Sequence, residues 1–241
     1  MFVAVAVAFY SLNSSVPPQN GVSPIPSSSA SPTPIQTPTP TSVSSPLPTL
    51  TASPFPTQAP TPTPVTSASY FYSFEQDMQG WEPRALDLDL AGFTINWSIA
   101  RSQERAEDGV TSLKSYLENF NDKGKIWIER SFDVQPNMQY DVDVSYAFAT
   151  ADWGAANHFV IITGVLPQSP QSRDQLVYQG STSNGAGSDV GFQWLTKHYS
   201  FTAQSDSTGK LYLIIGVWGT WETPRTYFLD AVNVSFALAG S

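Results

Sequence analysis

The charged residues of this chain are confined to its C-terminal part, and this segregation limits what can fold. Residues 1–74 contain no Asp, Glu, Lys or Arg, so all 20 acids and 11 bases, with the whole net charge of −9, follow from Glu75 onward. The prolines show the opposite trend, because 15 of the 20 lie between Pro17 and Pro64. Such a proline-crowded, uncharged segment cannot bury enough apolar surface to fold. We therefore expect one folded domain of about 170 residues, large enough for a substantial core, behind a linker.

The linker is the low-complexity segment 13–69, built of Ser, Thr and Pro with runs such as TPTPIQTPTPTSVSSP. Its composition predicts a disordered chain that favours extended polyproline II. At ~3.1 Å per residue it could reach on the order of 170 Å. We interpret it as a stalk that holds a domain away from a surface; recognition of its proline motifs by a partner is the alternative.

Residues 1–12, MFVAVAVAFYSL, are apolar and uncharged. They are too few to span a bilayer core, which takes about 20 residues, and they lack the basic start of a complete signal peptide. We interpret them as the remnant of an export signal or membrane anchor, which predicts an extracellular protein, secreted or attached to the cell surface. A stray apolar N-terminus, or a strand that pairs with the domain, are the alternatives.

The domain is acidic and has no basic run, which argues against nucleic acid and anionic membranes as partners. The same charge balance is compatible with calcium and with neutral ligands such as sugars. The chain has no cysteine, which excludes a disulfide framework, a thiolate metal site and a cysteine nucleophile.

From Tyr70 onward short strands alternate with turn signals, and no segment has a helical period. The clearest half-buried strand is 139–150, where Tyr140, Val142 and Val144 alternate with polar residues. In segment 210–218 both faces are apolar, as in a central strand covered on both sides. The pattern predicts an all-β fold, a single jelly-roll β-sandwich over residues 70–237. Ten strands are predicted, at 70–75, 93–101, 112–120, 125–133, 139–150, 158–165, 175–178, 192–201, 210–218 and 226–236.

The last predicted strand contains one acid that is out of place. Asp230 has the same parity as Phe228, Val232 and Val234, so a period of two puts its carboxylate on the core-facing side. Because an isolated buried charge is very unfavourable, we expect a cation, an arginine or a set of N–H donors beside Asp230.

Four short motifs follow one another in the domain: Ser73-Phe74-Glu75 with Gly80-Trp81, then DGVTSL from Asp108, FDVQP from Phe132, and YFLDAV from Tyr227. Their order resembles the carbohydrate-binding-module-like jelly rolls of the galactose-binding-like group, over about residues 70–237. The resemblance implies a sandwich fold and a polysaccharide or other glycan as the partner.

The resemblance also implies a structural calcium ion away from the sugar site. The matching positions are Glu75, Asp108, Ser112 and Asp230, and calcium prefers six to eight oxygen ligands of this kind. The alternatives for Asp230 are a pair with Arg225 or another base, or hydrogen bonds from the backbone.

Sugar binding requires flat aromatic surfaces with polar groups at their edges. Parity places two tryptophans on polar strand faces, and two more lie in loops, where binding residues concentrate. Trp81, Trp97 and Trp218 are interpreted as core residues, and packing remains the alternative for every tryptophan. The predicted ligand-binding residues are Trp127, Trp153, Trp194, His198, Trp221 and Glu222.

The case for an enzyme is weak. The chain has two histidines, no Gly-x-Ser-x-Gly elbow and no close histidine pair for zinc. Spacing alone leaves open two carboxylate pairs for glycoside hydrolysis, Glu129 with Asp143 and Glu222 with Asp152. The predicted function is therefore a non-catalytic carbohydrate-binding module displayed on a stalk. A structural or adhesive surface module that binds protein or envelope polymer is the first alternative, and a small jelly-roll hydrolase or lyase is the second.

Overall fold

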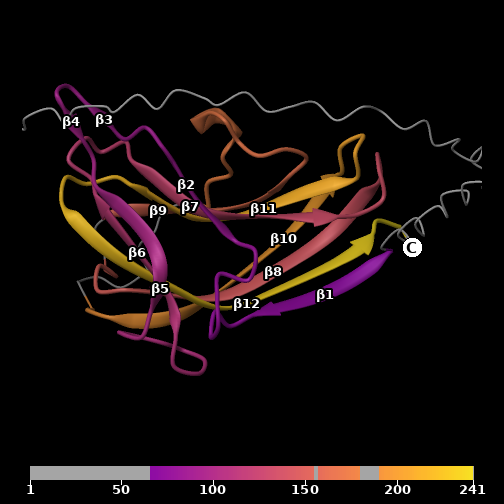
Figure 1. Cartoon of the computed structure of the whole chain (residues 1–241), viewed down its shortest axis with the longest axis horizontal. Coiled ribbons are helices and arrows are strands. Elements are labelled where there is room, and N and C mark those ends of the chain that lie inside the picture. Colours follow the sequence, from indigo (N-terminus) through magenta and orange to yellow (C-terminus); the bar gives the residue numbers. More distant parts are fainter. Residues whose placement is uncertain (1–65, 155–156, 180–189, 241) are drawn as a thin grey trace, which may run out of the picture. The chain divides into compact units, whose positions relative to one another are not determined.

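The computed structural model describes residues 66–154, 157–179 and 190–240. These residues form two antiparallel sheets that pack as a jelly-roll sandwich (Figure 1), which confirms the all-β prediction. In this part of the chain the only helical element is a single 3-10 turn, Arg173–Gln175, and no helix there has the length and apolarity to cross a membrane. The predictions for residues 1–12 and for residues 13–65 of the predicted 13–69 linker fall outside the described residues. Residues 67–69, at the end of that predicted linker, instead belong to the first strand, β1 (Ser67–Tyr72).

The larger sheet, called sheet A here, has the order β10-β8-β12-β6-β5, and β1 pairs with the second half of β12. Sheet B has the order β2-β7-β11-β9, and β3 pairs with β4 in a separate hairpin. In Figure 1, β7, β9 and β11 form one layer and β1, β8 and β12 the other. The strands of sheet A are β1 Ser67–Tyr72, β5 Trp97–Ser102, β6 Ser112–Glu118, β8 Gln139–Thr150, β10 Gln193–Gln204 and β12 Pro224–Leu238. The remaining strands are β2 Glu82–Leu86, β3 Asp89–Leu90, β4 Phe93–Thr94, β7 Lys125–Asp133, β9 Phe159–Leu166 and β11 Lys210–Gly219.

The core lies between the two sheets, and along the central strands every second residue points into it. On β8 every second residue from Tyr140 to Phe148 is buried, and on β11 the residues from Leu211 to Val217 do the same from the opposite sheet. The interior also contains a polar pair, in which the hydroxyls of Tyr146 and Thr163 hydrogen-bond at 2.6 Å. This bond satisfies two groups that would otherwise be unfavourable to bury.

Strand β11 is covered on both faces, as predicted. Its outward-facing Ile214 is buried because residues 167–179, which follow β9 and are called the strap here, fold back over sheet B. Leu176 of the strap packs with Ile214, Ile162 and Trp127 in a second, smaller apolar cluster. The strap is held to β9 by backbone bonds, among them Thr163 N–H to Val177 O at 3.1 Å.

The predicted side for Asp230 is wrong, although the residue is fully buried. A β-bulge lies between Asp230 and Asn233, and Ala231 has a positive φ of 50°. A bulge inserts one extra residue and so reverses the parity of everything beyond it. Phe228 and Asp230 consequently point to the outer face of sheet A, while Val232 and the residues after it point into the core.

Two local predictions also differ from the structure. Segment 175–178 is not a strand: it belongs to the strap, and its only ladder contact is an isolated bridge between Tyr178 and Ile162. The predicted strand 93–101 is divided into β4 and β5, and the sequence does not predict β2 or β3. Strand β2 reads EPRAL, which lacks alternation and contains Pro83, and proline is tolerated because β2 is an edge strand.

Candidate functional site

Two of the tryptophans predicted to bind a ligand are buried. Trp153 is 0% exposed, packs between Phe148 and Phe159 in the main core, and donates its indole N–H to Gln193 O at 2.8 Å. Trp127 lies on the predicted outer face of sheet B but is only 2% exposed, because the strap covers it. Neither indole therefore presents a ring face to a ligand.

Trp194 and His198 lie on the outer face of sheet A, as parity predicted. Trp194 is half-buried and packs edge-on against Phe228, at 6.3 Å between centroids. His198 is largely exposed, with Nε2 3.9 Å from Asp143 Oδ1. The depression beside His198 is small, ≈ 170 Å³, and does not include Trp194. These two residues share a face of the sheet but not a pocket.

Trp221 and Glu222 lie in the loop between β11 and β12, and both are exposed. The Trp221 ring, 59% exposed, stands 6.2 Å from the His158 ring, and its carbonyl accepts a hydrogen bond from Asn119 Nδ2 at 3.1 Å. The six predicted residues thus fall in four separate places, and the structure does not bring them together.

Three of the residues predicted to bind calcium, Glu75, Ser112 and Asp230, hold one loop, residues 103–111, and the fourth, Asp108, lies in that loop. Glu75 Oε1 accepts the N–H groups of Val110 and Thr111, both at 2.9 Å. Asp230 Oδ2 accepts those of Glu107 and Asp108, at 2.9 and 3.0 Å. The Ser112 hydroxyl donates to Arg105 O at 2.6 Å.

Asp230 therefore has the set of N–H donors that its burial requires, and Ala231 N–H adds a third at 2.7 Å. Burial raises the pKa of Asp230, and the backbone hydrogen bonds counteract this. Arg225 pairs with Asp152 instead. No three acidic or histidine side chains converge on one point within the described ranges. A calcium ion here would be held by Glu75, Asp108, Ser112 and Asp230 together with backbone oxygens, and it remains a prediction.

A guanidinium already occupies part of this region. Arg101 donates from Nε to Phe74 O at 2.6 Å and from Nη2 to Glu75 O. Both carbonyls lie just beyond β1, beside Glu75, where they would be the nearest backbone oxygens for a metal ion. Arg101 supplies positive charge there, so calcium would compete with an existing cation.

One of the two carboxylate pairs considered for hydrolysis, Glu129 with Asp143, is divided between the two sheets. Glu129 lies on the outer face of sheet B, bonded to Ser169 Oγ at 2.9 Å, whereas Asp143 lies on the outer face of sheet A beside His198. Asp152 is engaged with Arg225, whose side chain is 8% exposed. A glycosidic bond needs both carboxylates within one cleft, and Glu129 and Asp143 do not provide it.

The most suitable aromatic groove lies on the outer face of sheet B, at the end of the strap. It has a volume of ≈ 360 Å³, within the usual range for ligand sites. We call it the Trp218 groove. Two rings form its apolar part: Trp218 at the end of β11 and Tyr178 of the strap, with centroids 5.6 Å apart and planes at 65°. Its lining residues are Lys123, Lys125, Arg173, Asp174, Leu176, Tyr178 and Trp218.

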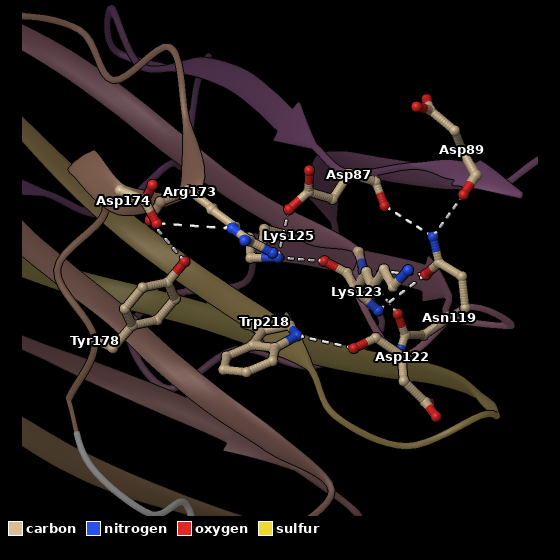
Figure 2. A network of polar contacts seen from close by, with 12 residues as sticks. Asp87, Asp89, Asn119, Asp122, Lys123, Lys125, Arg173, Asp174, Tyr178 and Trp218 are labelled. Atoms are coloured by element: carbon tan, nitrogen blue, oxygen red, sulfur yellow. Dashed lines mark hydrogen bonds and ion pairs between the residues drawn. The ribbon is translucent and has the colours of Figure 1, made fainter.

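The pairing of β11 with β7 places Trp218 directly opposite Lys125, the first residue of β7. Lys125 is buried, and its ammonium lies 2.7 Å from Asp87 Oδ2, 2.6 Å from Lys123 O and 5.1 Å from the Trp218 ring centroid. The Trp218 indole N–H donates to Asp122 O at 3.1 Å. These contacts, visible in Figure 2, hold the ring in one orientation.

The strap supplies the other wall of the groove. Tyr178 donates its hydroxyl to Arg173 O at 3.0 Å, and Gln179 ties the end of the strap to Thr163 O at 2.8 Å. Burial, and then the charge of Asp87, raise the pKa of Tyr178 to about 12. The phenol is therefore neutral at physiological pH, and its ring faces the groove as a stable apolar surface.

The sequence did not reveal this groove, because its residues come from three distant segments: 123–125, 173–178 and the end of β11. Parity grouped Trp218 with Ile214, which suggested a core residue, and Tyr178 was assigned to a strand of its own. Trp218 is in fact half-buried, beyond the edge of the strap. The one signal that could have indicated it is Lys125, a charged residue in the strand register opposite an aromatic one.

No model of a known protein family and no curated protein sequence matches the chain. Solved structures of several kinds resemble it. The CBM22-1 xylan-binding domain from Paenibacillus barcinonensis Xyn10C is 19% identical, over 71% of this chain and 95% of that one, with a TM-score of 0.38. The K1 cleaved adhesin domain of Lys-gingipain from Porphyromonas gingivalis W83 is 12% identical, over 69% of this chain and 97% of that one, with a TM-score of 0.40.

A Stig cyclase from Fischerella sp. TAU is similar to the same degree: 14% identity over 70% of this chain and 90% of that one, with a TM-score of 0.39. One of these three proteins is named for xylan binding, one for adhesion and one for cyclisation. The ligand of this chain must therefore be argued from its own residues.

Proposed function

We propose that the domain is a non-catalytic carbohydrate-binding module and that the Trp218 groove is its sugar site. The observation that carries this proposal is the pair of fixed rings, Trp218 and Tyr178, bordered by charged side chains. A pyranose has an apolar C–H face and a rim of hydroxyls. Rings of this kind pack on the C–H face, and Asp174 and Arg173 supply acceptors and donors for the hydroxyls.

The rest of the chain supports display outside the cell. Residues 13–69 have the composition of an extended linker, and residues 1–12 that of an export or anchoring segment. We place the domain at the end of this stalk, secreted or attached to the cell surface. Calcium at the 103–111 loop, if bound, would stabilise the fold away from the groove.

The test is a glycan panel with the full chain, by affinity electrophoresis and titration calorimetry. Trp218→Ala should weaken binding about 30-fold or more, as expected for a central aromatic contact worth about 2 kcal/mol. Tyr178→Phe keeps the ring and should bind within a few-fold. Trp194→Ala is the matched control, because it removes a half-buried indole from the other sheet.

Loss of binding in Trp194→Ala but not in Trp218→Ala would move the site to sheet A. Failure to bind any glycan would favour the second candidate, an adhesive module.

A separate observation supports that candidate. Phe93 and Phe120, 72% and 49% exposed, line an apolar groove with Ile95 near the β3–β4 hairpin, and exposed apolar patches mark contact surfaces.

A further inference from the structure

The Trp218 groove is positively charged in a protein that is strongly negative. Three of the chain's 11 bases line it, Lys123, Lys125 and Arg173, although the net charge is −9. The three cations reach the groove from two elements, the start of β7 with the loop before it and the strap (Figure 2). One acid, Asp174, lines the groove with them, and Asp87 pairs with Lys125, so these cations exceed these acids by one.

Only part of this charge is neutralised within the protein. Lys125 is matched by Asp87 at 2.7 Å and is 4% exposed, so it is a structural pair and is not available to a ligand. Arg173 Nε lies 3.6 Å from Asp174 Oδ1, but the two side chains are 67% and 88% exposed, and such surface pairs are weak and easily exchanged. Arg173 therefore remains free to bind an anion.

Lys123 is the uncompensated cation. Its side chain is exposed, and among the described residues its ammonium forms no ion pair. Its backbone, in contrast, is fixed, because Lys123 N–H donates to Asn121 Oδ1 at 3.0 Å and its carbonyl accepts from Lys125. A lysine with a fixed backbone and an unpaired ammonium is suited to bind an anionic group of a ligand.

We infer that the Trp218 groove selects an acidic sugar, a glycan whose uronic-acid carboxylate is bound by Lys123 and Arg173 while Trp218 and Tyr178 pack on its ring. This inference rests on the proposed function and adds the class of sugar. Charge-assisted hydrogen bonds to a carboxylate are about twice as strong as neutral ones. Asp87 and Asp174, the acids at the groove, each already have a cation beside them. Acids beyond a Debye length, about 8 Å at physiological salt, are largely screened.

The experiment compares acidic polysaccharides with neutralised forms of the same polymers, using the full chain. The probes are polygalacturonate, glucuronoxylan and alginate, each beside its methyl-esterified or carboxyl-reduced form. At least one acidic form should bind roughly tenfold tighter than its neutral form, as a hydrogen bond to a charged group predicts. This preference should fall as salt is raised from 0.05 to about 0.5 M.

Lys123→Gln should remove the preference and leave binding of the neutral form unchanged. Lys114→Gln is the matched control, because Lys114 is a lysine of sheet A that pairs with Glu104 away from the groove. A preference that survives in Lys123→Gln overturns the inference, and so does equal binding of polyglutamate, which would show charge without sugar recognition. Equal, Trp218-dependent binding of both forms overturns it too but leaves the proposed function standing. Absence of binding to every glycan refutes both.

Discussion

Substitution of Trp127 tests whether the strap covers the outer face of sheet B or leaves it open to a ligand. Its side chain is 2% exposed and packs with Ile162, Leu176 and Ile214. Replacing a buried tryptophan with alanine removes this packing and leaves a cavity, at a cost of about 3–5 kcal/mol. In a domain of this size each kcal/mol shifts Tm by about 2–4 °C, so Trp127→Ala should lower Tm by roughly 6–20 °C.

Trp127→Phe is the matched variant. The indole N–H of Trp127 has no hydrogen-bond partner among the described residues. Phenylalanine therefore keeps a ring in the cluster and removes an unsatisfied donor, and we expect a loss of only about 1 kcal/mol. Urea unfolding and thermal melts of the full chain, followed by circular dichroism, measure both variants.

Glycan binding by these variants gives the second readout. Well below its Tm, Trp127→Ala should keep the affinity of the native protein within a few-fold, because the indole does not reach the Trp218 groove surface. An unchanged Tm combined with lost binding would refute the reasoning. In that case the strap does not cover Trp127, and the ring is the exposed platform that its strand parity suggested.

Three further predictions concern other parts of the fold. Gly216→Ala should lower the free energy of unfolding by about 1–3 kcal/mol or more, measured by urea unfolding, because the new Cβ would lie 2.2 Å from Ile126 O. An unchanged free energy of unfolding would contradict this close packing. Burial lowers the pKa of Lys197 from its usual 10.5, so folding disfavours its charged form and stability rises as pH climbs through the lowered pKa. Lys197→Met should therefore melt higher at pH 7, with a gain that shrinks as the pH rises through the lowered pKa toward 10.5; a gain independent of pH would point to packing alone. Calcium in excess over a chelator should raise Tm, by about 2.7 kcal/mol of stability at 100 times Kd, and Asp108→Asn should abolish the rise. A Tm that does not change on chelation would show that backbone N–H donors alone stabilise the buried carboxylate of Asp230.

The strands could be predicted where one face is buried by the opposite sheet. The sequence predicts segments 125–133 and 139–150 with the bounds that β7 and β8 have, because core-facing apolar residues recur at every second position along most of each segment. Strand β2 could not be found in this way. It is an edge strand with charged residues and a proline, so its sequence resembles a loop, and only its pairing with β7 makes it a strand.

The candidate site was harder to predict than the fold, because period-two alternation assigns a face but not what covers that face. Trp127 and Trp218 both point outward from sheet B, on neighbouring strands. The strap buries the first and leaves the second half-exposed. That difference depends on where residues 167–179 fold back, which is a long-range contact with no local signature.

The bulge in β12 shows how a single residue can reverse such an assignment. Ala231 adopts a left-handed conformation that costs a non-glycine residue about 1 kcal/mol, and Asp230 compensates for it by accepting Ala231 N–H on one oxygen. Its other oxygen holds the 103–111 loop over the outer face of sheet A. The buried carboxylate therefore joins the bulge to the loop, so that the parity shift in β12 and the covering of Asp230 stabilise each other.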